Sequence, residues 1–213
     1  MIVVVQRLLD SESSLHNVFW LICTTSENFH ITRDRSFSQL GIERDQGNKS
    51  IRINPNDRMV FYLNDVRRFA ATVTVTSEPF ESHDRIWKHH SEAEDFPHRV
   101  NIKPDLVLDE EQYLDGLQIG PGLEYVSKWP PEQWNMALLG MLHIISKRDF
   151  NFLEEQMRRL KSKKRRSNRR RRKGNELQIK TELEEPEVIV SNAEGNPKIS
   201  GGQNADTSTQ RPS

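Results

Sequence analysis

The sequence has a single cysteine, Cys23, among its 213 residues, so an intrachain disulfide and a thiol-only metal site are both excluded. It also lacks any run approaching the roughly 20 apolar residues of a membrane-spanning helix. The short apolar start at residues 1–9 is interrupted by Arg7, and no small-residue cleavage site follows it, so we predict no signal peptide. We therefore expect a soluble intracellular protein, in the cytoplasm, nucleoid or nucleus, with no membrane partner.

The motifs of common enzymes are missing too. There is no glycine-rich phosphate loop and no Gly-x-Ser-x-Gly nucleophile turn. Four histidines cluster in sequence without the helical i, i+4 pair or the cysteine partner of a zinc site; they are His83, His89, His90 and His98. Cys23 lies in an apolar run, where a thiol is usually inert packing. We predict a protein that is not an enzyme and uses no metal and no cofactor.

The formal net charge of zero hides a strong asymmetry along the chain. Residues 158–173, which we call the basic run, contain twelve Lys or Arg and no acid. Residues 1–157 contain 24 acidic and 16 basic residues, and residues 174–213 contain seven acidic and three basic ones. Polar composition and a mean hydropathy of −0.76 predict disorder beyond the basic run. We predict a lead-in at 1–16, a folded domain at 17–157, a basic linker at 158–173 and a disordered tail at 174–213.

Residues 53–80 organise the predicted fold. The Asn-Pro-Asn-Asp sequence at 54–57 is typical of a turn, and an apolar strand-like run follows at 59–62. Residues 69–76 alternate valine with threonine, the pattern of a half-buried strand. The polar connection at 64–65 joins these two runs, which predicts an antiparallel hairpin.

The remaining pattern places further elements around this hairpin. The apolar run at 17–24 predicts a buried central strand. We further expect a long surface loop with a helical turn at 30–50, a strand at 96–102 closed by Lys103-Pro104, a helix starting within 107–117, a short strand at 123–126, a helical turn at 132–139 and a strand at 143–145. A last helix has an apolar face made by Phe150, Leu153, Met157 and Leu160. Trp129 and Trp134 are assigned to the core.

The order of several motifs along the chain is informative. They are Phe19-Trp20-Leu21, Asn28-Phe29, Thr32-Arg33, Gly41, residues 53–58, Val60-Phe61-Tyr62, Phe69-Ala70, residues 75–78, Ile86-Trp87, residues 96–100, residues 128–134, Gly140 and Asp149-Phe150. In this order they resemble the EVE-domain family of the PUA-like superfamily, over roughly residues 17–157. Asn56 stands where the family usually has glycine in a Pro-Gly-Asp turn, and asparagine tolerates the left-handed conformation that the turn needs.

The resemblance implies an α+β fold, a PUA-like open β-barrel with flanking helices. It also implies a non-catalytic module that binds DNA or RNA and takes a flipped, modified base into an aromatic pocket. The related YTH domains bind methylated adenine in RNA, and EVE domains are thought to read modified cytosine, often in DNA. We expect the protein to be a monomer.

Two sets of residues are candidates for such a site. The base-pocket candidates, aromatic or small polar residues near the family's pocket-forming elements, are Trp20, Thr24, Ser26, Phe29, Phe37, Ser38, Tyr62, Phe80 and Trp87. The candidates for phosphate contacts are Arg165, Arg166, Arg169, Arg170, Arg171, Arg172 and Lys173. The aromatic residues are equally the residues of a plain core, and the basic run is equally a solvated linker or a targeting signal.

Two other functions are compatible with the sequence. The charged tail could bind an acidic protein partner, which would make this an interaction or sequestration factor that reads no base. The chain could also act as an enzyme on a nucleotide-like small molecule, the weakest of the three hypotheses.

Overall fold

The structure, a computed structural model, describes residues 17–88 and 95–164. The predicted lead-in, the end of the basic run and the predicted tail lie outside these residues. Within the described ranges, every helix is too short or too polar to cross a membrane.

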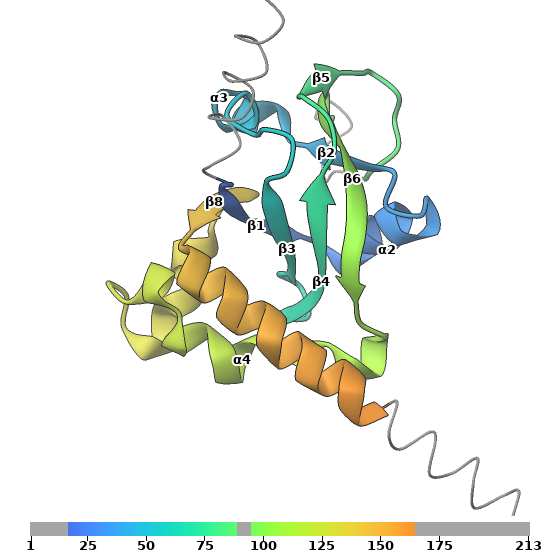
Figure 1. The fold of residues 1–213 in the computed structure, drawn as a ribbon. Coiled ribbons are helices and arrows are strands. Elements are labelled where there is room, and N and C mark those ends of the chain that lie inside the picture. The colour runs from blue at the N-terminus through green and yellow to red at the C-terminus, as the bar shows by residue number, and fades with distance from the viewer. Residues whose placement is uncertain (1–16, 89–94, 165–213) are drawn as a thin grey trace, which may run out of the picture. The chain divides into compact units, whose positions relative to one another are not determined.

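Eight strands among the described residues form one mixed sheet that curls into an open barrel (Figure 1). They are β1 (Phe19–Thr24), β2 (Gln39–Ile42), β3 (Arg58–Leu63), β4 (Arg68–Val75), β5 (Phe80–Glu81), β6 (His98–Val107), β7 (Leu114–Asp115) and β8 (Leu142–Ile145). The strand order is β2-β6-β4-β3-β1-β8, with β5 added to β6 and β7 added to β4. Only the β1–β3 pair is parallel. The predicted fold class, an α+β open barrel with flanking helices, is confirmed for the described chain.

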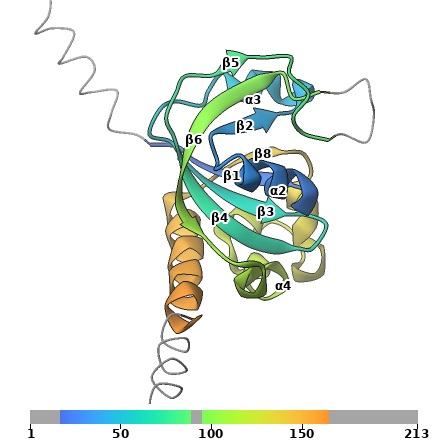
Figure 2. The ribbon, with the colours of Figure 1, turned by 90° about the vertical axis from the view of Figure 1, so that its right-hand side faces the viewer.

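Helices cover both faces of this sheet. The helical elements are α2 (Ser26–Asp34), η1 (Arg44–Gln46), α3 (Gly47–Ser50), η2 (Glu110–Gln112), α4 (Gly116–Ile119), η3 (Gly120–Gly122), η4 (Glu124–Val126) and η5 (Pro131–Leu138). A further helix at residues 147–164, which we call the C-terminal helix, ends the described chain. In Figure 2, β6 bends around the side on which α2 lies, and the C-terminal helix packs on the opposite side.

The alternation of side chains along β1 shows why the sheet is covered twice. Trp20 and Ile22 enter the core on the α2 side, whereas Leu21 and Cys23 enter the core beneath the C-terminal helix. A strand buried on both faces reads as a continuous apolar run, which is the pattern that predicted it. The predicted apolar face of the C-terminal helix is confirmed, because Phe150, Leu153 and Met157 are fully buried and Leu160 is half-buried; all four pack in or against the second core.

The predicted hairpin is confirmed as β3 and β4, which pair antiparallel from Arg58↔Thr74 to Leu63↔Arg68. Asn56 adopts a φ of 75°, so asparagine does take the left-handed position of the preceding turn. The buried Asp57 carboxylate accepts hydrogen bonds from the backbone N–H groups of Val18 (2.8 Å) and Asn54 (3.0 Å) and from the indole N–H of Trp20 (2.9 Å). This carboxylate therefore joins the start of β1 to the start of β3. The strand predicted at 143–145 is also confirmed as β8.

The loop predicted at 30–50 is wrong for residues 30–42, which contain the end of α2 and β2, whereas the helical turn expected within it is present as η1 and α3. Thr25 accepts a hydrogen bond from the N–H of Asn28 and caps α2, and β2 follows after a tight turn. Only one large apolar side chain of α2, Phe29, is fully buried, so the helix carries little periodic signal. The strand predicted at 96–102 extends to Val107, because Pro104 sits where the β4–β6 register shifts and the ladder tolerates a missing N–H.

The segment between β6 and β8 contains three further corrections. The helix expected from 107–117 is instead η2, β7 and α4, and the strand expected at 123–126 is η4. Short turns of this kind have no length over which periodicity can show. Trp134 is buried as predicted, but Trp129 is 41% exposed. The helical turn predicted after the proline pair is confirmed as η5.

Candidate functional site

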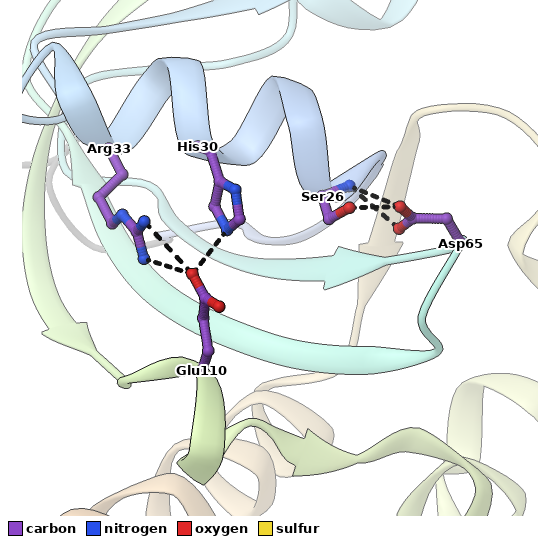
Figure 3. A network of polar contacts seen from close by, with 5 residues as sticks. All are labelled: Ser26, His30, Arg33, Asp65 and Glu110. Carbon is purple, nitrogen blue, oxygen red and sulfur yellow. Dashed lines mark hydrogen bonds and ion pairs between the residues drawn. The ribbon is translucent and has the colours of Figure 1, made fainter.

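The candidate site lies at the end of the sheet where the parallel strands β1 and β3 finish. β1 leads directly into α2, and β3 leads into a turn at residues 64–67. The carboxylate of Asp65 accepts the N–H of Ser26, at 3.0 and 3.1 Å, and also its hydroxyl (Figure 3). A carboxylate at a helix N-terminus is stabilised by unsatisfied N–H groups and by the helix dipole. The turn is therefore tied to the first residue of α2.

The turn is also tied from its other side. Arg67 adopts a φ of 55°, which is costly for a residue with a side chain. Its carbonyl accepts the N–H of Gly116 at 2.9 Å. A Cβ on Gly116 would lie 2.6 Å from this carbonyl oxygen and 2.9 Å from the ring of Tyr62, so only glycine fits. Residues of this turn line two hollows.

The first hollow, which we call the α2 hollow, has a volume of about 440 Å³. Its lining residues are Ser26, His30, Val66, Arg68, Glu110, Glu111 and Tyr113. Most of its polar groups are already paired: Glu110 Oε1 lies 3.3 Å from His30 Nε2 and 3.4 Å from Arg33 (Figure 3). Arg68 pairs with Asp115 at 2.9 Å. These contacts hold the walls in place.

Two polar atoms of the α2 hollow are buried without a hydrogen-bond partner among the described residues, His30 Nε2 and the hydroxyl of Tyr113. Burial raises the pKa of this phenol, with the acids Glu110 and Asp109 adding to the rise and Arg33 opposing it, so the hydroxyl stays protonated at neutral pH. The ring stands edge-on to Phe29, with centroids 6.1 Å apart. The hollow thus has a positioned hydrogen-bond donor without an acceptor.

The second hollow, which we call the Cys23 hollow, has a volume of about 320 Å³. Its lining residues are Cys23, Glu43, Tyr62, Asn64, Arg67, Asn135, Leu138, Leu139, Gly140 and Met141. Burial raises the pKa of the Cys23 thiol, and the nearby Glu43 adds to this effect. Burial, the neighbouring Cys23 and Asp115 raise the pKa of Tyr62 to about 12, against an opposing contribution from Arg67. Both groups are therefore neutral at physiological pH.

The predicted base-pocket residues divide between these hollows, the core and the surface. Ser26 lines the α2 hollow and Tyr62 lines the Cys23 hollow. Trp20, Phe29 and Phe37 are buried in one core cluster. Thr24 and Phe80 are half-buried and Ser38 is exposed, and these three line neither hollow. Of the nine candidates, only Ser26 and Tyr62 line these two hollows, one in each.

Trp87 is held elsewhere, over β2. Its indole N–H donates to Thr32 Oγ1 at 2.8 Å, and the guanidinium of Arg99 lies 5.3 Å from its ring centroid. The amide of Asn28 bonds the N–H and the carbonyl of the following Lys88, each at 2.8 Å. These contacts fix Trp87 as a packed side chain.

Sequence reasoning missed most residues that line the hollows, including His30, Tyr113, Asn64, Arg67 and Asn135. None lies in a recognisable motif, and their proximity arises only when the turn at 64–67 meets α2, α4 and η5. The seven basic candidates at 165–173 lie outside the described residues. Within the described ranges, no cluster of His, Cys, Asp or Glu could hold a metal ion.

Comparison with known proteins finds distant relatives. No family model matches the sequence. The chain is 25% identical over 145 residues to a UPF0310 protein of Pyrococcus abyssi, a match that covers 64% of this chain and 96% of that protein. Among solved structures, the YTH domain of Zygosaccharomyces rouxii MRB1 in complex with N6-methyladenosine RNA is 15% identical, with 67% of this chain and 88% of that chain covered and a TM-score of 0.49. Human THYN1 in complex with 5-methylcytosine-containing DNA is 13% identical, with 66% and 98% covered and a TM-score of 0.45. Identities and TM-scores at this level assign the chain to no family.

Proposed function

We propose that this protein is a non-catalytic nucleic-acid-binding module that takes a modified base of DNA or RNA into the α2 hollow. The observation that carries this proposal is the buried, unpartnered hydroxyl of Tyr113 in the wall of that hollow. Buried polar groups in folded proteins are nearly always paired, so an unpaired one calls for an explanation such as a ligand. The volume of the hollow lies in the range of about 300–1,000 Å³ typical of ligand pockets.

The chemistry of the walls suits a base. The rings of His30 and Tyr113 offer faces or edges to a planar ligand, as single flipped bases require. The Glu110 carboxylate can accept a hydrogen bond from the exocyclic amino group of cytosine or adenine. The Tyr113 hydroxyl donates to a ring nitrogen or carbonyl. Together these groups read a base edge that carries both a donor and an acceptor.

The basic run supplies the affinity for the phosphate backbone in this proposal. Its described part reaches the rim of the α2 hollow, because Lys164 Nζ lies 3.1 Å from Glu111, a lining residue, and 3.0 Å from Asp109. Cations that neutralise phosphates release counterions, which gives sequence-independent affinity at modest salt. They also offset the excess of acids in residues 1–157, which would otherwise repel a polyanion.

The test compares Tyr113→Phe with Tyr125→Phe in the full chain. The probes are matched oligonucleotides with and without 5-methylcytosine or N6-methyladenine, measured across a salt series. We expect the wild type to prefer a modified oligonucleotide at high salt, and Tyr113→Phe to weaken that binding about tenfold, the effect of one lost hydrogen bond. Because the Tyr113 hydroxyl is unpaired, the same variant should resist urea at least as well as the wild type.

Tyr125→Phe is the matched control. The Tyr125 hydroxyl donates to His143 Nδ1 at 3.0 Å, away from the α2 hollow, so its loss should lower stability and leave the modification preference unchanged. Equal binding of all oligonucleotides that disappears at high salt, or when the Arg and Lys residues at 165–173 are replaced by Gln, would refute base reading. Such a result would favour a module whose basic run acts alone.

A further inference from the structure

The turn between β3 and β4 contains a residue that turn chemistry does not explain. The turn spans residues 64–67, because Leu63 and Arg68 are the last paired residues of the two strands. Gly, Pro, Asn, Asp and Ser dominate such turns, whereas β-branched residues are typical of strands. Val66 lies in this turn and is 47% exposed. A single exposed aliphatic residue is ordinary on a protein surface, so the meaning of Val66 depends on where it lies.

Val66 lies in the wall of the α2 hollow. It is the only apolar aliphatic residue among those that line this hollow. The other lining side chains are charged, or they carry a hydroxyl or an imidazole. Such polar groups recognise the donors and acceptors on the edge of a base, whereas an apolar substituent gains free energy by burial against apolar surface. Val66 is therefore the part of the wall that favours an apolar group on the ligand.

We propose that Val66 is the contact surface for the modifying group of the base, and that the α2 hollow thereby selects a methylated base over the unmodified one. This inference rests on the proposed base-reading function. It adds the residue that distinguishes the two forms of the base.

Hydrogen bonds on both sides of Val66 hold the turn in place. Asp65 is tied to α2 and the Arg67 carbonyl is tied to α4, as described above. In addition, the N–H of Asn64 donates to the carbonyl of Thr24 at 3.0 Å. A β-branched side chain is also stiff at χ1, so Val66 loses little entropy when a ligand packs against it. The turn thus presents a preorganised apolar surface.

The charged groups of the hollow do not supply this discrimination. Glu110, Glu111 and Arg68 line the hollow, together with the titratable His30. A methyl group carries no charge, so Coulomb interactions with these side chains do not separate a methylated base from an unmethylated one. Burial of one methyl group against apolar surface is instead worth about fourfold in affinity. Loss of the Val66 surface should remove this factor.

The test measures the ratio of the affinities for methylated and unmethylated oligonucleotides, using the full chain. The probes are matched pairs with and without 5-methylcytosine or N6-methyladenine, at high salt so that phosphate contacts contribute little. Val66→Thr keeps the shape of the side chain and replaces one methyl group with a hydroxyl. We expect it to lower the ratio about fourfold. The affinity for the unmethylated probe and the midpoint of urea unfolding should stay unchanged, because Val66 is exposed.

Two variants are controls. Val66→Ile keeps a β-branched aliphatic surface and should keep the ratio. Ile51→Thr makes the same kind of change at a side chain that is 74% exposed and lines neither hollow, so it should alter neither the ratio nor the affinity.

The outcomes separate this inference from the proposed function. A wild-type preference for the methylated probe that Val66→Thr retains would overturn the role of Val66 and leave base reading intact. An equal loss of affinity for both probes in Val66→Thr would overturn it as well. A wild type without any preference at high salt would refute base reading, and the role of Val66 with it.

Discussion

The same turn lines both hollows, yet the two hollows hold their polar groups in different ways. Around the α2 hollow most polar side chains are held by neighbours, as Ser26 is by Asp65 and Arg68 by Asp115. The Tyr113 hydroxyl and His30 Nε2 are buried there without a hydrogen-bond partner among the described residues. In the Cys23 hollow, by contrast, Asn64, Arg67 and Asn135 are exposed to solvent. A preorganised wall loses little entropy when a ligand binds, whereas exposed side chains must be ordered by the ligand. We therefore expect selective binding in the α2 hollow rather than in the Cys23 hollow.

The change with the largest expected effect displaces the turn that lines both hollows. Gly116→Ala forces a methyl group against the Arg67 carbonyl and the Tyr62 ring, so the turn at 64–67 must move. We expect a loss of about 2–3 kcal/mol in the free energy of unfolding, as for overpacked sites, together with loss of oligonucleotide selectivity in the α2 hollow. Urea unfolding and the oligonucleotide binding assay measure this.

Gly122→Ala is the control for that variant, because a Cβ at Gly122 would meet no atom within 4 Å. It should keep the stability and the oligonucleotide selectivity of the wild type. Normal selectivity in Gly116→Ala would show that the turn does not shape the α2 hollow.

A substitution with a smaller expected effect acts on the α2 hollow alone. Asp65→Ala removes the acceptor for the N–H and hydroxyl of Ser26 and should cost about 1 kcal/mol, the typical effect of losing a helix cap. Because Ser26 lines the α2 hollow, oligonucleotide selectivity should fall as well. Asp34→Ala, an exposed acid in the last turn of α2, is the control and should do neither.

The smallest expected effect is a pH dependence next to the Cys23 hollow. The Nε2–H of the neutral, buried His143 donates to the carbonyl of Gly140, a lining residue, at 3.0 Å, and Nδ1 accepts the Tyr125 hydroxyl. Burial lowers the pKa of His143 below its ordinary value of 6.5. The unfolded chain then binds the proton more readily, so stability should be full above pH 6.5 and fall as the pH drops below it.

The check on this pH effect is a series of urea titrations between neutral and mildly acidic pH. His143→Gln should flatten the difference in stability between the two ends of the series. An unchanged slope in this variant would assign the pH dependence to other groups.

Elements with long, regular patterns could be predicted from the sequence. The hairpin β3–β4, the doubly buried β1 and the apolar face of the C-terminal helix each repeat a signal over six or more residues. The helix α2 could not be predicted, because its buried residues include Asn28 and Thr32, which look like surface. The continuation of β6 through Pro104 depends on a register shift in its partner strand, which no local pattern records.

The site was predictable only in part, for a related reason. Ser26 and Tyr62 were proposed because they lie near the pocket-forming elements of the family that the sequence resembles, and each lines one of the two hollows. Trp20 was proposed for its ring, but its indole N–H binds the buried Asp57, a contact between residues 37 positions apart in the sequence. Tyr113 and Arg67 matter because of an unpaired hydroxyl and a strained backbone angle, and both are properties of the folded chain alone.

The position of β1 between β3 and β8 has a consequence for the order of events during synthesis. As the chain leaves the ribosome, β1 can pair on one edge once β3 has emerged, but its other edge waits for β8, where Leu21 faces His143. An apolar strand with an open edge is an aggregation hazard, and contacts this distant in sequence form slowly. Nascent chains arrested before β8 should therefore depend on chaperones. The hazard ends when β8 has paired with β1 and the C-terminal helix has packed on the sheet.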